Sequence, residues 1–200
     1  MRKTLLSLAL CAAVALGVVP AHAKGGLKTM GTDPAGDGLP GLDVTSLQVG
    51  RKGANLEVRI GLVMLPQAAG YPDLPGIEWV FVVQPPMPPC PPGKYCIQAM
   101  PNPRTFVAEA VKTAGGSAFY LFEIHDDGSF EQIGQPEGTY NAADGFTSIF
   151  VPLSEIGARK GATIRGVDGL EHGDVDAHVH AGPQTHYPDG METNKSYVVP

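Results

Sequence analysis

The sequence of 200 residues contains few of the residues and none of the motifs that mark common enzyme classes. It has three cysteines and one tryptophan, and aromatic residues make up 7% of the chain. A G-x-S-x-G elbow, an H-E-x-x-H pair and a phosphate-binding glycine loop are all missing from the sequence. Because no complete catalytic constellation is present, the sequence favours a non-enzymatic role.

Positive charge is also scarce. The chain has 14 Lys and Arg residues against 20 Asp and Glu residues, and Arg2 and Lys3 lie in a segment that we expect to be removed. The remaining 12 basic and 20 acidic residues give a formal net charge of −8. Nucleic acid and anionic membrane surfaces are therefore poor partners, whereas cations are suitable ligands.

The one long apolar run lies at the start of the chain. Leu5 to Val19 follows Met1-Arg2-Lys3, and Ala21-His22-Ala23 supplies the small-x-small pattern that signal peptidase recognises. The run is about 15 residues long, shorter than the roughly 20 that a membrane span needs. We therefore expect residues 1–23 to be a cleaved signal peptide, with an uncleaved anchor as the alternative. Residues 24–200 then form one secreted or periplasmic domain without a transmembrane segment.

Two cysteines remain once Cys11 leaves with the signal peptide. Cys90 and Cys96 lie close together within the proline-rich segment from Gln84 to Arg104. In an oxidising compartment this pair is expected to form a disulfide that fixes the shape of the segment. The spacing is not C-x-x-C, which argues against a redox-active site.

Glycine and proline separate short apolar runs along the chain, as is typical of an all-β domain. Between residues 56 and 64, the apolar residues at 56, 58, 60, 62 and 64 alternate with Glu57, Arg59 and Gly61, as in a strand with one buried face. Residues 77–83 are apolar on both faces from Trp79, as in a covered central strand. Trp79 is expected in the core, with a sugar-stacking platform as the alternative.

The remaining apolar runs complete the predicted fold. We expect further strands at residues 42–49, 105–113, 117–125, 130–133, 146–151, 162–167, 174–180 and 196–199. About ten strands without an amphipathic helix predict a single antiparallel β-sandwich with a jelly-roll-like arrangement.

Two stretches of the chain look like a known group of domains. The first is Thr32-Asp33-Pro34-Ala35-Gly36-Asp37 with residues 42–49 and 56–60, and the second is Gly138-Thr139-Tyr140 with residues 149–157 and Gly161. They resemble exported β-sandwich domains of the DOMON-like group, which includes the family 9 carbohydrate-binding modules. The resemblance implies a jelly-roll sandwich that binds sugars, haem or calcium, or that serves as an accessory module beside an enzyme. The chain departs from a typical sugar-binding module because it has a single tryptophan in place of an aromatic sandwich.

Asp33, Asp37 and Asp43 crowd into one glycine-rich loop. Calcium takes six to eight oxygen ligands from carboxylates and backbone carbonyls, and such a loop supplies several of them. The loop lacks the EF-hand pattern, and Asp-Pro and Asp-Gly steps are also ordinary turn formers. A calcium site and plain turn chemistry are both open at this point.

The segment from Asp174 to His180 alternates acidic or histidine residues with valine and alanine. In a strand, Asp174, Asp176, His178 and His180 would share one face. Two histidines in an H-x-H pattern chelate Zn²⁺ or Cu²⁺, and carboxylates complete the shell. His172 and His186 lie near enough in sequence to contribute. The alternative is the solvated outer face of an edge strand.

Together these features predict a secreted, non-enzymatic binding or accessory domain. Calcium would stabilise it, and carbohydrate or another extracellular protein would be its partner. The competing interpretation is a secreted transition-metal-binding protein or metalloenzyme built on the His178/His180 strand.

Overall fold

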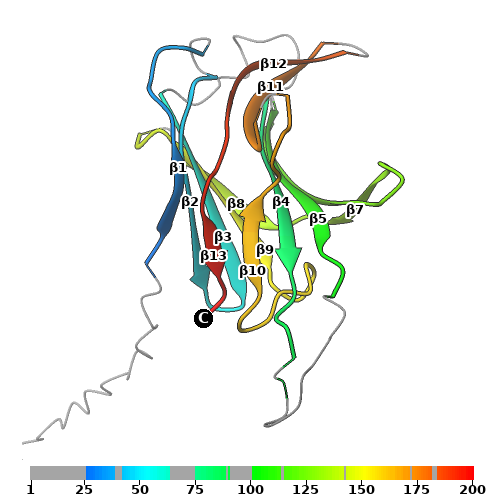
Figure 1. Cartoon of the computed structure of the whole chain (residues 1–200). Coiled ribbons are helices and arrows are strands. Elements are labelled where there is room, and N and C mark those ends of the chain that lie inside the picture. Colours follow the sequence, from blue (N-terminus) through cyan, green and yellow to red (C-terminus); the bar gives the residue numbers. More distant parts are fainter. Residues whose placement is uncertain are drawn as a thin grey trace, which may run out of the picture.

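The computed structural model describes residues 26–38, 42–63, 75–88, 90, 101–113, 115–141, 143–171, 173–181 and 184–200. In these residues, strands form two antiparallel sheets that pack as a sandwich (Figure 1). The predicted all-β sandwich is therefore confirmed. Among the described residues, no helix has the length and apolar character needed to cross a membrane.

The first sheet has five strands in the order β1-β2-β3-β9-β8, and each neighbouring pair is antiparallel. Its strands are β1 (Lys28–Thr32), β2 (Val44–Lys52), β3 (Asn55–Leu62), β8 (Glu137–Asn141) and β9 (Phe146–Pro152). The turn between β2 and β3 contains Gly53 at a φ of 64°, a left-handed conformation that glycine adopts without strain. The alternation along β3 places Leu56, Val58 and Ile60 in the core, which leaves Glu57 and Arg59 on the outer face.

The second sheet has eight strands, with β12-β11-β4-β5-β6-β7 as its main path. Its strands are β4 (Pro75–Gln84), β5 (Arg104–Thr113), β6 (Gly116–Ile124), β7 (Phe130–Gly134), β10 (Thr163–Gly166), β11 (Val175–Ala181), β12 (Gln184–Met191) and β13 (Ser196–Val198). Strands β10 and β11 share one edge of β4, because β11 pairs with residues 75–79 and β10 with residues 81–84. Between them, the N–H of Val80 donates to the carbonyl of Asp174 at 2.7 Å.

The core lies between the sheets and is centred on aromatic residues of β4 and β5. Trp79 is fully buried, its ring stacks on Phe81 with centroids 4.5 Å apart, and Phe81 contacts Phe106 at 5.7 Å. The prediction that Trp79 belongs to the core is confirmed, and a sugar-stacking role for it is excluded by its burial.

Three strands escaped the sequence-based prediction, namely β1, β8 and β12. Each lies at an edge of its sheet and contains only one or two large apolar side chains, so no alternating apolar pattern marks it in the sequence. The structure also corrects the predicted position of β11 within its sheet. One interpretation made this segment a solvated edge strand, but it runs between β12 and β4, and Asp176 and His178 are buried.

Candidate functional sites

One group of carboxylates gathers where the end of β1 meets β12. Asp33 follows β1, Asp37 lies in the next turn and Asp189 belongs to β12, and a carboxylate oxygen from each lies within 4.8 Å of the others. Asp189 also accepts a hydrogen bond from the N–H of Val44 at 2.5 Å, which links β12 to the start of β2. We call Asp33, Asp37, Asp43 and Asp189 the aspartate loop cluster.

Asp43 contacts the same turn, and its charge acts on Asp33. Its side chain is 3% exposed, and its Oδ2 accepts a hydrogen bond from the N–H of Gly36 at 2.6 Å. Its Oδ1 is buried and has no hydrogen-bond partner among the residues that the structure describes. The packing around Gly38 is close, since a Cβ there would lie 2.8 Å from the Cβ of Asp189 and 2.9 Å from the Cα of Asp43. The turn thus lies directly against both carboxylate-bearing segments.

The electrostatics of the cluster reflect crowded negative charge. Burial raises the pKa of Asp33, and the carboxylates of Asp37 and Asp43 raise it further. Burial also raises the pKa of Asp189, while the N–H groups of Val44 and Gly190 oppose the shift and Asp37 and Asp33 add to it. A bound cation would relieve this repulsion.

The sequence identified three of these four residues. Asp189 was missed because it lies in a Pro-Asp-Gly step that is typical of an ordinary turn. The pairing of β12 with β11 and the hydrogen bond with Val44 bring it to the loop, and no local pattern indicates these long-range contacts.

A second group lies on the outer face of the eight-stranded sheet. His178 of β11 is 2% exposed, its Nδ1 lies 3.2 Å from Oδ1 of Asp176, and its Nε2 lies 3.1 Å from Oε1 of Glu109 on β5. Glu78 of β4 completes the group, and one ligand atom each of Glu78, Glu109 and His178 lies within 4.8 Å of the other two. We call Glu78, Glu109, Asp176 and His178 the outer-face cluster.

The fold makes room for the imidazole at a single glycine. Gly76 of β4 pairs with His178 of β11, and a Cβ at this position would overlap with Nε2 of the ring. Any other residue at this position would push the imidazole away from Glu109.

Burial shifts the titration of this cluster. Burial raises the pKa of Glu78 to about 8, with the charge of Asp176 as the next cause. Burial lowers the pKa of His178, but hydrogen bonds with Asp176 and Glu109 outweigh this effect and raise the pKa to about 10. The cluster therefore favours states that bind protons or other cations.

The sequence identified Asp176 and His178 but not Glu78 or Glu109. Each missed glutamate interrupts a strand that is otherwise apolar, in Ile77-Glu78-Trp79 and in Ala108-Glu109-Ala110. A carboxylate in an apolar strand with both faces covered indicates a functional or paired charge, and this feature of the sequence could have identified both glutamates.

Asp174 takes a different place from the one predicted. It lies before β11, and its carboxylate accepts hydrogen bonds from Nε1 of Trp79 at 3.0 Å and from the N–H and hydroxyl of Thr193, each at 2.5 Å. Burial raises its pKa despite these bonds. Asp174 thus ties the core tryptophan to the chain after β12 and does not join the outer-face cluster.

Several predicted positions lie beyond what the structure describes. His180 belongs to β11 and His186 to β12, but their side chains are outside the described set, as are His172, Cys96 and residues 1–25. The Cys90–Cys96 bridge and the signal peptide at residues 1–23 therefore stay predictions.

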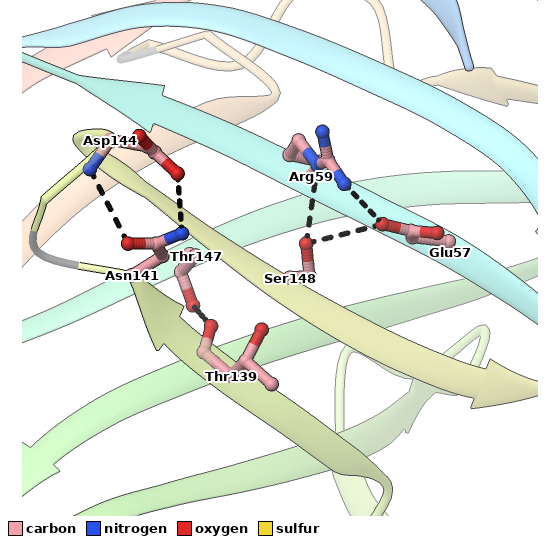
Figure 2. Close-up of polar contacts among 7 residues, drawn as sticks. All are labelled: Glu57, Arg59, Thr139, Asn141, Asp144, Thr147 and Ser148. Atoms are coloured by element: carbon pink, nitrogen blue, oxygen red, sulfur yellow. Dashed lines mark hydrogen bonds and ion pairs between the residues drawn. The ribbon is translucent and has the colours of Figure 1, made fainter. Parts of the chain in front are cut away.

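A groove of about 430 Å³ lies on the outer face of the five-stranded sheet. It is lined by Lys52, Glu57, Arg59, Thr139, Tyr140, Asn141, Phe146, Ser148 and Phe150. Figure 2 shows the polar floor, where Arg59 Nη2 lies 2.8 Å from Oε1 of Glu57 and Ser148 lies within hydrogen-bond distance of both side chains.

Aromatic rings lie in the same groove. Phe146 and Phe150 are partly exposed, with the guanidinium of Arg59 4.3 Å from the Phe146 centroid and Nζ of Lys52 4.2 Å from the Phe150 centroid. The groove therefore combines flat apolar faces with hydrogen-bonding side chains of both charges.

Comparisons with known proteins give no relative from which a role can be transferred. No protein-family model matches the chain, and neither a curated protein nor a solved structure matches it. The resemblance to DOMON-like domains stays a prediction, and the roles of the residues above depend on their geometry.

Proposed function

We propose that this chain is an exported, non-enzymatic binding domain that holds a calcium ion in the aspartate loop cluster. The observation that carries the proposal is the convergence of Asp33, Asp37 and Asp189. Asp43, whose charge acts on Asp33, adds a buried Oδ1 that has no hydrogen-bond partner among the described residues. Export is inferred from residues 1–23 and is tested by the intact mass of the secreted protein, which should begin at Lys24.

Turn chemistry alone accounts for only part of this arrangement. It explains why Asp43 Oδ2 accepts from Gly36 and why Asp189 Oδ2 accepts from Val44. It does not explain the second oxygen of Asp43, which is buried without a donor in the described part of the chain, because a buried oxygen without a donor costs about 1–3 kcal/mol. A calcium ion satisfies oxygens of this kind, and irregular chain such as residues 33–38 supplies carbonyl ligands as well.

The direct test is calorimetric titration of the chelator-treated protein with Ca²⁺. We expect one ion per chain, with an affinity at least tenfold weaker in Asp37→Asn, because Asp37 is the exposed member whose loss disturbs the fold least. Asp126→Asn is the matched control, since Asp126 is an exposed aspartate in the turn between β6 and β7. Equal binding by the wild type and Asp37→Asn would refute the site.

The groove on the five-stranded sheet favours carbohydrate as the ligand of this domain. Sugars bind through apolar ring faces that stack on aromatic side chains and through hydroxyls that hydrogen-bond to polar ones. Phe146 and Phe150 supply the first kind of contact, and Glu57, Arg59 and Asn141 supply the second. A sugar on Phe150 would displace the flexible side chain of Lys52, which then reaches a hydroxyl.

Retention on insoluble cellulose, xylan and chitin tests this second candidate. We expect retention on at least one of them to fall at least fivefold in Phe150→Ala and to remain unchanged in Phe130→Ala. Phe130 is the control because it is 65% exposed on β7 of the other sheet. Retention of neither the wild type nor the variants on any polymer would refute binding of these three polysaccharides by the groove.

A further inference from the structure

The outer-face cluster places three carboxylates side by side across three strands. Asp176 of β11 is the direct cross-strand partner of Glu78 of β4, and Glu78 is the direct partner of Glu109 of β5. Like charges at directly opposed positions destabilise a sheet. Asp176 and Glu109 are also buried, which increases the cost of holding them ionised.

The imidazole of His178 enters this row from the neighbouring level of β11. Its Nε2 faces Glu109 and its Nδ1 faces Asp176, so the ring joins two carboxylates at 3.1 and 3.2 Å. Metal-binding histidines are commonly oriented by a carboxylate on one ring nitrogen while the other nitrogen holds the ion. Here Asp176 contacts Nδ1, and Nε2, which contacts Glu109, would be the ligand nitrogen.

We propose that Glu78, Glu109 and His178 bind one divalent transition-metal ion of the zinc class. Asp176 acts as the positioning residue that fixes the orientation of the imidazole through Nδ1. The three ligand atoms lie within 4.8 Å of one another and come from three hydrogen-bonded strands, so small side-chain rotations bring them around one ion. The ion replaces the contact between Nε2 and Glu109 with two metal–ligand bonds and neutralises two carboxylates.

The choice of metal follows from the donors. One imidazole nitrogen with two carboxylate oxygens is a set that Zn²⁺ accepts, at about 2.0–2.2 Å from each atom. Calcium takes oxygen ligands only, so the outer-face cluster and the aspartate loop cluster select different ions. Glu78 is only partly buried, which gives the ion a path from solvent, and Gly76 keeps the space that the ring occupies.

The structure contains a matched comparison for this site. His125 and Glu131 also form a histidine–glutamate pair, with Nε2 and Oε2 3.1 Å apart, but both side chains are exposed. The distance between nitrogen and oxygen is the same in both pairs, whereas the burial and the second glutamate are specific to the outer-face cluster.

The experiment is titration of the chelator-treated full chain with Zn²⁺ by calorimetry and with Co²⁺ by visible absorption. We expect one high-affinity site per chain and a Co²⁺ spectrum of a four- or five-coordinate site. Glu109→Gln should weaken binding at least 100-fold, and Asp176→Asn should weaken it about 10- to 100-fold, as for other partners of metal-bound histidines. Glu131→Gln should leave binding unchanged.

Two further measurements keep the result interpretable. Trp79 fluorescence in each variant reports whether the core is intact, and Glu78→Gln, at the partly exposed ligand, replaces Glu109→Gln if that variant does not fold. Asp37→Asn should retain full Zn²⁺ affinity, so failure of the calcium site leaves this inference standing. Unchanged Zn²⁺ affinity in the folded glutamate variant, or a wild type that binds no Zn²⁺, would overturn it and identify the cluster as a buried network of ion pairs.

Discussion

Asp37→Asn should have effects of opposite sign in the absence and in the presence of calcium. In chelator, the variant removes one of four crowded carboxylates, so the free energy of unfolding should rise slightly. In calcium, it removes a ligand, so the variant should become less stable than the wild type. The order of stability of the variant and the wild type therefore reverses between chelator and calcium. Such a reversal is specific to a site where the same charges repel one another and bind an ion.

Both magnitudes can be estimated. Asp37 is exposed, so the repulsion that its loss relieves is at most about 1 kcal/mol in a water-like dielectric. Calcium sites in extracellular modules have dissociation constants of roughly 0.1–1 mM, so about 10 mM calcium stabilises the wild type by roughly 1.4–2.7 kcal/mol through mass action. For a domain of this size, the melting temperature should rise by about 3–10 °C.

Thermal melts followed by circular dichroism, with chelator or with calcium, provide the assay. The wild type and Asp126→Asn should show the full shift, whereas Asp37→Asn, with an affinity at least tenfold weaker, should show at most about half of it. Magnesium at the same concentration should give a smaller shift, because it demands octahedral geometry and loses water reluctantly. A wild type that melts at one temperature in both buffers would refute the reasoning.

Three other outcomes follow from the same structure. Gly76→Ala should lower the free energy of unfolding by about 1–3 kcal/mol, because the new alanine Cβ would overlap with the ring of His178. An unchanged urea midpoint would contradict the placement of the ring. In chelator, the free energy of unfolding should fall as pH rises from about 5 to 10. The folded-state pKa values of Glu78 and His178 are raised to about 8 and about 10, so the folded protein loses its stabilising protons over this range. Urea midpoints that are flat or rise with pH would count against these shifts. Non-reducing peptide mapping of the exported protein should recover Cys90 linked to Cys96, and two alkylatable thiols would exclude the bridge.

The sequence predicted the interior strands well because burial imposes a pattern on them. In β3 the alternation of Leu56, Val58 and Ile60 is explicit, and in β4 the apolar run around Trp79 is continuous. The strands β1, β8 and β12 have no such pattern, since each contains only one or two large apolar side chains. Proline and glycine in β12 instead indicated a turn, and an edge strand tolerates both residues.

The candidate sites were predictable only where their residues are neighbours in the sequence. Asp33, Asp37 and Asp43 lie within one loop, and Asp176 and His178 lie within one strand. Their partners come from elsewhere in the chain, and the strand register that joins them is set by the packing of the whole sandwich. For this reason the sequence suggested two kinds of metal chemistry without completing the donor set of either site.

The strands at the margins of both sheets have a consequence for how copies of this protein behave toward one another. An open strand offers unpaired N–H and C=O groups to a strand of a second molecule, which is how many β-proteins aggregate. Here β8 and β7 are five residues long, β1 has an irregular register between Thr29 and Gly31, and β12 contains Pro188. Short, bulged or proline-bearing margins are poor templates for strand addition, so these features, together with the net negative charge of the chain, disfavour edge-to-edge pairing between copies of the protein.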